Sequence, residues 1–115
     1  MIKDSIELKA FVEKTLKEKK AENIVTLELD NEVFFTKYMV FASGKSKKSV
    51  SSIAEFLSDE LKHKAGRTIT IEGLRNSDWV LIDCGDIVVH IFHPDARSYY
   101  NVEENWFAKL SKNKK

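Results

Sequence analysis

The spacing of hydrophobic positions along the chain predicts three amphipathic helices. In each, apolar side chains recur every three or four residues, which places them on one helix face. Asp4 or Ser5 can cap the first helix and Ser46 or Ser49 the second, because short polar side chains accept hydrogen bonds from free N–H groups. The third helix opens at Pro94. The predicted buried positions are Leu8, Phe11, Val12, Thr15 and Leu16, then Val50, Ile53, Ala54, Leu57 and Leu61, then Tyr99, Val102, Trp106 and Leu110.

Between these helices, shorter segments have the pattern of β-strands. Alternating apolar and polar residues are typical of strands with one buried face, and a nearly continuous apolar run is typical of a central strand. The predicted strands are Ile24–Leu29, Tyr38–Ala42, Thr68–Glu72, Asp78–Asp83 and Ile87–Phe92, of which Tyr38–Ala42 is the continuous run. The element order α-β-β-α-β-β-β-α predicts an α/β (α+β) fold with a single mixed β-sheet and flanking helices.

The last two predicted strands form a hairpin that carries the most functional information. If Cys84-Gly85 is its two-residue loop, Asp83 faces Asp86 and Trp79 faces His90 across the strands. Alternation then divides the side chains between two faces of the sheet. The core face holds Val80, Ile82, Ile87, Val89 and Ile91, and the other face holds Trp79, Leu81, Asp83, Asp86, Val88, His90 and Phe92. A mixture of aromatic rings, an imidazole and two carboxylates is unusual for a buried surface and for a solvated one.

Two interpretations of the pair Asp83 and Asp86 remain open. Carboxylates that face each other across two strands destabilise a hairpin by roughly 0.2–1 kcal/mol, a cost that a solvated hairpin tip tolerates. Alternatively, the pair receives a lysine or arginine from a partner, with Trp79 and Tyr99-Tyr100 beside it as apolar anchors. Aromatic anchors with a charged rim are the usual anatomy of a binding hot spot.

Composition and charge narrow the class of protein. The 115 residues, 43% hydrophobic and 32% charged, fit one soluble domain at residues 1–108, followed by a basic tail at 109–115 that we expect to be disordered. From Thr68 to Ala108 the chain has seven acidic and two basic residues, which suits a basic protein partner better than nucleic acid. The lone cysteine, the absence of an export signal and the absence of a membrane-length apolar segment predict a cytoplasmic protein without membrane contact.

Features that could support catalysis or a cofactor are weak. Gly44-Lys45-Ser46 lies between a predicted strand and a helix but lacks the upstream glycine of a phosphate-binding loop. No histidines and cysteines have the spacing of a zinc site, and the acids beside Cys84 should raise the pKa of its thiol. We therefore expect no catalytic residue, no metal and no cofactor. The alternative is a divergent metal-dependent nucleotidyltransferase or hydrolase that uses Asp83, Asp86 and a metal near His90.

One long motif resembles a known family. It begins at Glu72-Gly73, runs through residues 76–92 (Asn-Ser-Asp-Trp-Val-Leu-Ile-Asp-Cys-Gly-Asp-Ile-Val-Val-His-Ile-Phe) and continues with Arg97, Tyr99-Tyr100, Glu103 and Trp106. These residues closely resemble the ribosomal silencing factors, the Iojap-related family, and the resemblance extends over about residues 6–107. The chain departs from the family pattern at Lys37, where relatives commonly have an acidic residue.

The resemblance implies a fold similar to nucleotidyltransferases but without their active site. It also implies a translational repressor that binds the large ribosomal subunit, chiefly through its fourteenth protein, and sterically blocks joining of the small subunit. A factor for assembly of the large subunit is the alternative, since both roles would use the same docking surface. The residues expected on or just beneath that surface are Trp79, Asp83, Asp86, His90, Arg97, Tyr99, Tyr100 and Trp106. We expect little direct contact with nucleic acid, and an exposed aromatic face could pair two free copies as a homodimer.

Overall fold

The computed structural model describes residues 2–29 and 36–95 of the chain. In chain order the elements are α1 (Ser5–Glu18), β1 (Glu22–Glu28), β2 (Tyr38–Ser43), α2 (Lys47–His63), β3 (Thr70–Glu72), β4 (Trp79–Asp83) and β5 (Ile87–Phe92). This order confirms the predicted succession up to the last strand. The predicted C-terminal helix, with Arg97, Tyr99, Tyr100 and Trp106, and the tail at 109–115 lie outside the described residues.

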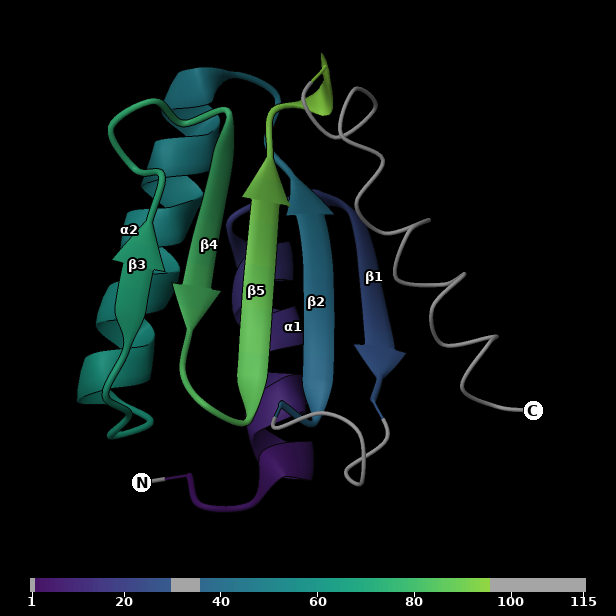
Figure 1. Ribbon diagram of the computed structural model, residues 1–115, viewed down its shortest axis with the longest axis vertical. Coiled ribbons are helices and arrows are strands. Elements are labelled where there is room, and N and C mark those ends of the chain that lie inside the picture. The colour runs from purple at the N-terminus through teal and green to yellow at the C-terminus, as the bar shows by residue number, and fades with distance from the viewer. Residues whose placement is uncertain (1, 30–35, 96–115) are drawn as a thin grey trace.

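The strands form one mixed sheet in the order β1-β2-β5-β4-β3 (Figure 1). Neighbours β2 and β5 run parallel, and the other neighbouring pairs are antiparallel. Both β2 and β5 are buried along their whole length. The central position predicted for the apolar run at residues 38–42 is therefore confirmed, as is the predicted mixed α/β fold class.

Both helices cover the same face of the sheet and lie behind the strands in Figure 1. Asp4 caps α1 by accepting a hydrogen bond from Ile6 N–H at 2.8 Å, and Ser46 caps α2 by accepting one from Ser49 N–H at 3.1 Å. The main core lies between the helices and the sheet, where burial of apolar area stabilises the fold. Its largest fully buried helix residues are Leu8, Leu16, Ile53, Leu57 and Leu61.

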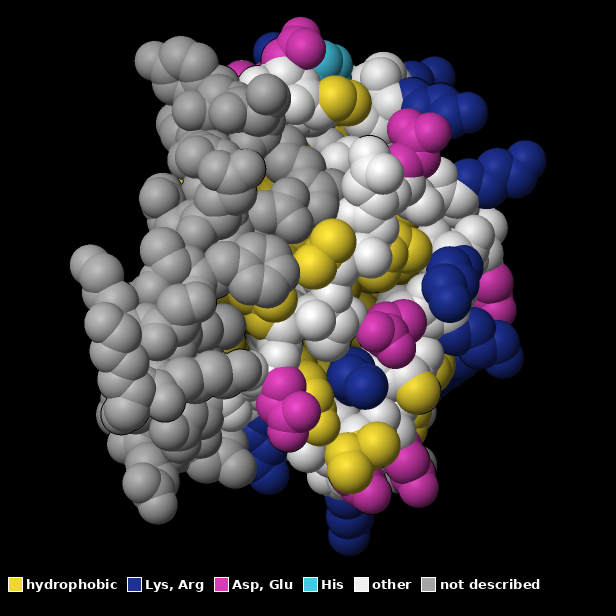
Figure 2. Space-filling model, turned by 90° about the vertical axis from the view of Figure 1, so that its right-hand side faces the viewer, with side chains coloured by type: hydrophobic (Ala, Val, Ile, Leu, Met, Phe, Trp, Pro, Cys, Tyr) yellow, Lys and Arg dark blue, Asp and Glu magenta, His cyan; other side chains and the backbone are white. Residues whose placement is uncertain are grey.

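The surface of the molecule mixes both signs of charge. Figure 2 views the β1 side, where lysine and arginine side chains are interspersed with acidic and hydrophobic ones and form no continuous basic patch on the part that is described. Within residues 2–29 and 36–95, no helix is long and apolar enough to cross a membrane.

The hairpin register predicted from the sequence is wrong by two residues. Asp83 pairs with Val88 and Trp79 with Phe92, so Asp83 does not face Asp86. A shift of two residues keeps each side chain of the paired strands on its predicted face, because side chains alternate with a period of two. The predicted core face is therefore confirmed, whereas the predicted repulsion between the two carboxylates across the strands is absent.

A different loop explains this shift. The turn residues are Gly85 and Asp86, and Cys84 N–H closes the turn by donating to Ile87 O at 3.0 Å. Gly85 has a φ of 89°, whereas Asp86 has no positive φ, which is the pattern of a type II′ turn with glycine first. Asp83 Oδ1 also accepts a hydrogen bond from Gly85 N–H at 2.9 Å. This contact stabilises the turn from the end of β4.

Candidate functional site

The face of the sheet opposite the helices carries a second, largely aromatic cluster. Its members are Leu27, Leu29, Met39, Phe41 and Phe92, with Val25 and Trp79 packed against them. The register of the strands places Phe41 beside His90, His90 beside Leu81, and Leu81 beside Glu72. The row therefore changes from aromatic to acidic toward β3. We call the end of this face formed by Glu72, Gly73, Trp79, Leu81 and Asp83 the acidic-aromatic edge.

Trp79 ends a stack of four rings at this edge, together with Phe41, His90 and Phe92. The ring centroids of Phe41 and His90 are 5.0 Å apart with an interplanar angle of 13°, and those of Trp79 and Phe92 are 5.3 Å apart at 27°. Such stacking adds about 0.5–1.5 kcal/mol per pair beyond the burial of area. Phe41 and Phe92 are fully buried, whereas Trp79 is half-buried. Trp79 is thus the ring of this stack that reaches the surface.

His90 lies inside the stack and positions the Trp79 indole. The indole Nε1–H donates to His90 Nδ1 at 3.0 Å, so the proton of the neutral imidazole is on Nε2. Burial disfavours the charged imidazolium and lowers the pKa of His90 from 6.5 to about 4. Nε2 is itself buried and has no hydrogen-bond partner within the described part of the chain. His90 therefore lies beneath the surface, as a neutral acceptor for Trp79.

A hollow of about 270 Å³ opens at the acidic-aromatic edge and is lined by Glu72, Gly73, Trp79 and Leu81. Gly73 is needed here because its φ is 85° and a Cβ atom would lie 2.2 Å from Trp79 O. Glu72 is exposed and forms no ion pair with any other described residue. The hollow thus combines apolar walls with one carboxylate. This combination suits a lysine or arginine side chain, whose stem is apolar and whose head is cationic.

The two aspartates predicted to act together have separate environments. Asp83 is exposed on the same face as Trp79 and forms no ion pair among the described residues. Asp86 lies in the turn, where its Oδ2 is 3.5 Å from Nη1 of Arg67. One of the two interpretations of the aspartates places a partner's cation beside them; at Asp86 that cation is Arg67 of this chain.

The features with catalytic potential have structural roles. Gly44 permits a close approach to α2, since a Cβ atom there would lie 2.8 Å from Val50 N, and Ser46 is the helix cap. The pKa of Cys84 is raised mainly by burial, while the neighbouring carboxylates contribute less than predicted. Within the described residues, no three His, Cys, Asp or Glu side chains lie close enough to hold a metal ion.

The predicted site residues include neither Glu72, although it opens the family-like motif, nor Arg67. Glu72 belongs to a short alternating strand in which Ile71 packs on the main core, so alternation alone places Glu72 on the opposite face. That signal was available in the sequence. The pairing of Arg67 with Asp86 joins residues on different elements and depends on the tertiary fold.

Comparisons with known proteins connect this geometry to a family. The chain matches the family model described as ribosomal silencing factor during starvation over residues 2–115. The ribosomal silencing factor RsfS of Zymomonas mobilis is 42% identical over 96 residues, which cover 84% of this chain and 72% of that protein. A mouse protein named mitochondrial assembly of ribosomal large subunit protein 1 is 30% identical over 94 residues, which cover 79% of this chain and 41% of that protein.

A solved structure supports the same grouping. The crystal structure of a protein from Chromobacterium violaceum superposes with a TM-score of 0.84 at 31% sequence identity. The superposition covers 90% of this chain and 87% of that protein. The similarity therefore extends over the whole sheet and both helices rather than over one motif.

Proposed function

The chain belongs to the ribosomal silencing factor family, and from this membership we propose that it represses translation by binding the large ribosomal subunit in the cytoplasm. In its finer form, the proposal is that the chain docks on the fourteenth protein of that subunit and prevents the small subunit from joining. The name of the mouse relative, which refers to assembly of the large subunit, supports the same target.

The observation that carries the proposal is the hollow between Glu72, Trp79 and Leu81. A basic side chain from a ribosomal protein would place its aliphatic stem on Trp79 and Leu81 and its charge beside Glu72. Asp83 extends the negative charge along the same face, diagonally across from Glu72 in the register of β3 and β4. Desolvated aromatic anchors with complementary charge at the rim are typical of energetically important contacts.

The other residues of the predicted docking surface have supporting positions in this proposal or lie outside the described residues. His90 acts from beneath by fixing the Trp79 indole, and Asp86 is at the turn, paired with Arg67. The other predicted residues, Arg97, Tyr99, Tyr100 and Trp106, follow the described part of the chain directly and stay predictions from sequence.

The proposed mechanism requires occupancy and no chemistry. A protein bound where the small subunit must dock prevents joining for as long as it remains bound, so repression depends on concentration and on the dissociation rate. We therefore propose that the chain is not an enzyme. An assembly role, favoured by the name of the mouse relative, would use the same docking surface on a precursor of the large subunit.

The test is co-sedimentation of the purified protein with separated large and small subunits. We expect the wild-type protein to sediment with the large subunit alone. Reversing two charges in the variant Glu72→Lys/Asp83→Lys should weaken this binding at least about tenfold, because cations would then face a basic partner. The matched control is Glu55→Lys/Asp59→Lys, which makes the same change in charge on the exposed surface of α2.

Two outcomes would contradict the proposal. Binding to neither subunit would remove the ribosomal target, and equal losses in both double variants would remove the acidic-aromatic edge as the docking surface. Circular dichroism and thermal unfolding of each variant show whether a loss of binding reflects a loss of folding. Sedimentation velocity at rising concentration, in the same buffer, tests whether the free protein forms the predicted homodimer.

A further inference from the structure

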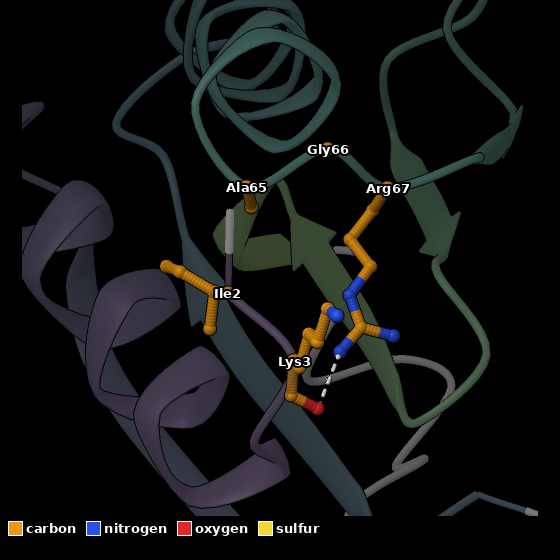
Figure 3. A pocket seen from close by; sticks show the side chains of 5 residues that line it. All are labelled: Ile2, Lys3, Ala65, Gly66 and Arg67. Atoms are coloured by element: carbon orange, nitrogen blue, oxygen red, sulfur yellow. Dashed lines mark hydrogen bonds between the residues drawn. The ribbon is translucent and has the colours of Figure 1, made fainter.

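A second cavity, which shares no lining residue with the hollow at the acidic-aromatic edge, lies between the N-terminal segment and the end of α2. It has a volume of about 290 Å³ and is lined by Ile2, Lys3, Ala65, Gly66 and Arg67. Figure 3 shows the side chains of Lys3 and Arg67 extending toward each other from opposite walls. A backbone hydrogen bond from Ile2 N–H to Ala65 O, at 3.3 Å, ties the two walls together. The cavity is therefore built into the fold, because both walls are anchored.

The two cations in this cavity are incompletely neutralised. Lys3 forms no ion pair with any described residue, and its side chain is exposed. Arg67 has one carboxylate neighbour, Asp86, at 3.5 Å, which is longer than the 2.7–2.9 Å typical of a charge-assisted hydrogen bond. Arg67 Nη2 donates weakly to Lys3 O at 3.3 Å. Most of the five N–H donors of the guanidinium therefore remain available.

The backbone beside Arg67 adds a further donor. Two of the carbonyls in the last turn of α2 accept hydrogen bonds: Lys64 and Ala65 N–H donate to Glu60 O, and Arg67 N–H donates to Leu61 O. Gly66 N–H has no acceptor within residues 2–29 and 36–95. The C-terminal end of a helix carries partial negative charge, so the two cations must outweigh it for an anion to bind here. A guanidinium and an ammonium thus line one small cavity, and Gly66, whose N–H has no acceptor among the described residues, lies in its wall.

We propose that this cavity binds a small dianionic oxyanion of the phosphate class. A phosphate group carries close to two negative charges near neutral pH, which matches two cations, and its oxygens accept the paired N–H groups of an arginine. The volume is at the lower end of the range for ligand pockets, so it suits inorganic phosphate or a small phosphate monoester. The site shares no residue with the hollow at Glu72, Trp79 and Leu81, but it adjoins the predicted docking surface at Asp86, which pairs with Arg67.

Asp86 gives the proposal a test by gain of binding. Because its carboxylate competes for Arg67, Asp86→Asn should strengthen phosphate binding several-fold, whereas Arg67→Gln should weaken it at least about tenfold. The control is Lys14→Gln, which removes a positive charge from an exposed position on α1. Inorganic phosphate and glycerol 3-phosphate are titrated separately into the full chain at constant ionic strength, and affinities are read from amide shifts in two-dimensional NMR.

The expected result is a saturable shift of the amides of Lys3, Gly66 and Arg67, with the stated order of affinities among the variants. The tighter of the two probes identifies whether free phosphate or a monoester is the better ligand. Amide spectra of each variant without phosphate verify that it is folded. No saturable shift at millimolar phosphate, or the same affinity in Arg67→Gln and Lys14→Gln, would overturn the proposal.

Discussion

The neutral state of His90 links the stability of the fold to pH. The pKa of His90 is about 4 in the folded protein and near 6.5 when the chain unfolds, so below pH 6.5 the unfolded chain takes up the proton more readily. The stabilisation that the neutral His90 gives the folded protein is fully present above pH 6.5 and is lost as the pH falls toward 4. The difference corresponds to about 3 kcal/mol of unfolding free energy in the wild-type protein.

Replacing His90 by a ring that does not titrate isolates this effect. In His90→Phe the ring stack with Phe41 and Phe92 can persist, and the half-buried Trp79 indole can hydrogen-bond to water. We expect the variant to lose less unfolding free energy than the wild type between pH 7 and pH 4.5, as measured by urea unfolding at several pH values. Parallel curves for the two proteins would show that His90 is not the titrating group.

At the residue scale, the sequence predicted which face of the sheet each hairpin residue occupies better than it predicted their contacts. Trp79 and His90 share the predicted face, but they were expected to lie directly opposite each other. In the structure Trp79 is opposite Phe92, and its indole reaches His90 diagonally. The hydrogen bond could not be derived from alternation, because alternation defines faces and leaves the register open.

At the scale of elements, the register of the β4–β5 hairpin depends on which of two overlapping residue pairs forms its loop. Cys84-Gly85 and Gly85-Asp86 both contain the glycine that a two-residue turn requires. Burial favours the second, since it places Cys84 on the main core, where it is 4% exposed, and leaves Asp86 in the turn. The preference of a thiol for the interior over a turn is a packing effect, which local turn chemistry does not reveal.

The turn between β3 and β4 gives a prediction at this scale. Gly73→Ala should destabilise the protein because Cβ would overlap Trp79 O and because φ there is positive. Gly85→Ala is the matched control: its φ is 89°, but a Cβ atom there would meet nothing within 4 Å. We expect about 1–2 kcal/mol for Gly85→Ala from backbone strain, and a larger loss for Gly73→Ala, in urea unfolding.

Comparing the two glycine variants separates the cost of backbone strain at a positive φ from the cost of the overlap between Cβ and Trp79 O. The excess loss in Gly73→Ala measures the close approach that shapes the hollow beside Trp79, so the same variant should also weaken binding of the large subunit. Equal losses of unfolding free energy in both variants would mean that the β3–β4 turn can move aside. Binding of the large subunit by Gly85→Ala should remain at the wild-type level.

At the scale of the whole molecule, the order of elements was predictable, whereas the order of strands in the sheet was not. Periodicity identified each described helix and strand, and the continuous apolar run correctly indicated a central strand. The parallel pairing of β2 with β5 connects segments separated by α2 and two strands. Such long-range pairing depends on the complementarity of whole faces, and no local pattern along the chain encodes it.

The proposed mechanism, steric exclusion of the small subunit, predicts how the order of addition affects the rate. Protein added to free large subunits should prevent joining at once, because its docking surface is accessible. Protein added to joined ribosomes should act only as fast as the subunits separate, since the two ligands compete for one surface. Light scattering should therefore change with a delay when the protein is added to joined ribosomes. The final scattering intensity should be the same whichever component is added first. The control is the variant Glu72→Lys/Asp83→Lys, which should leave the subunits joining normally at concentrations where the wild-type protein prevents joining. A time course that does not depend on the order of addition, or repression in which the subunits stay joined, would contradict steric exclusion.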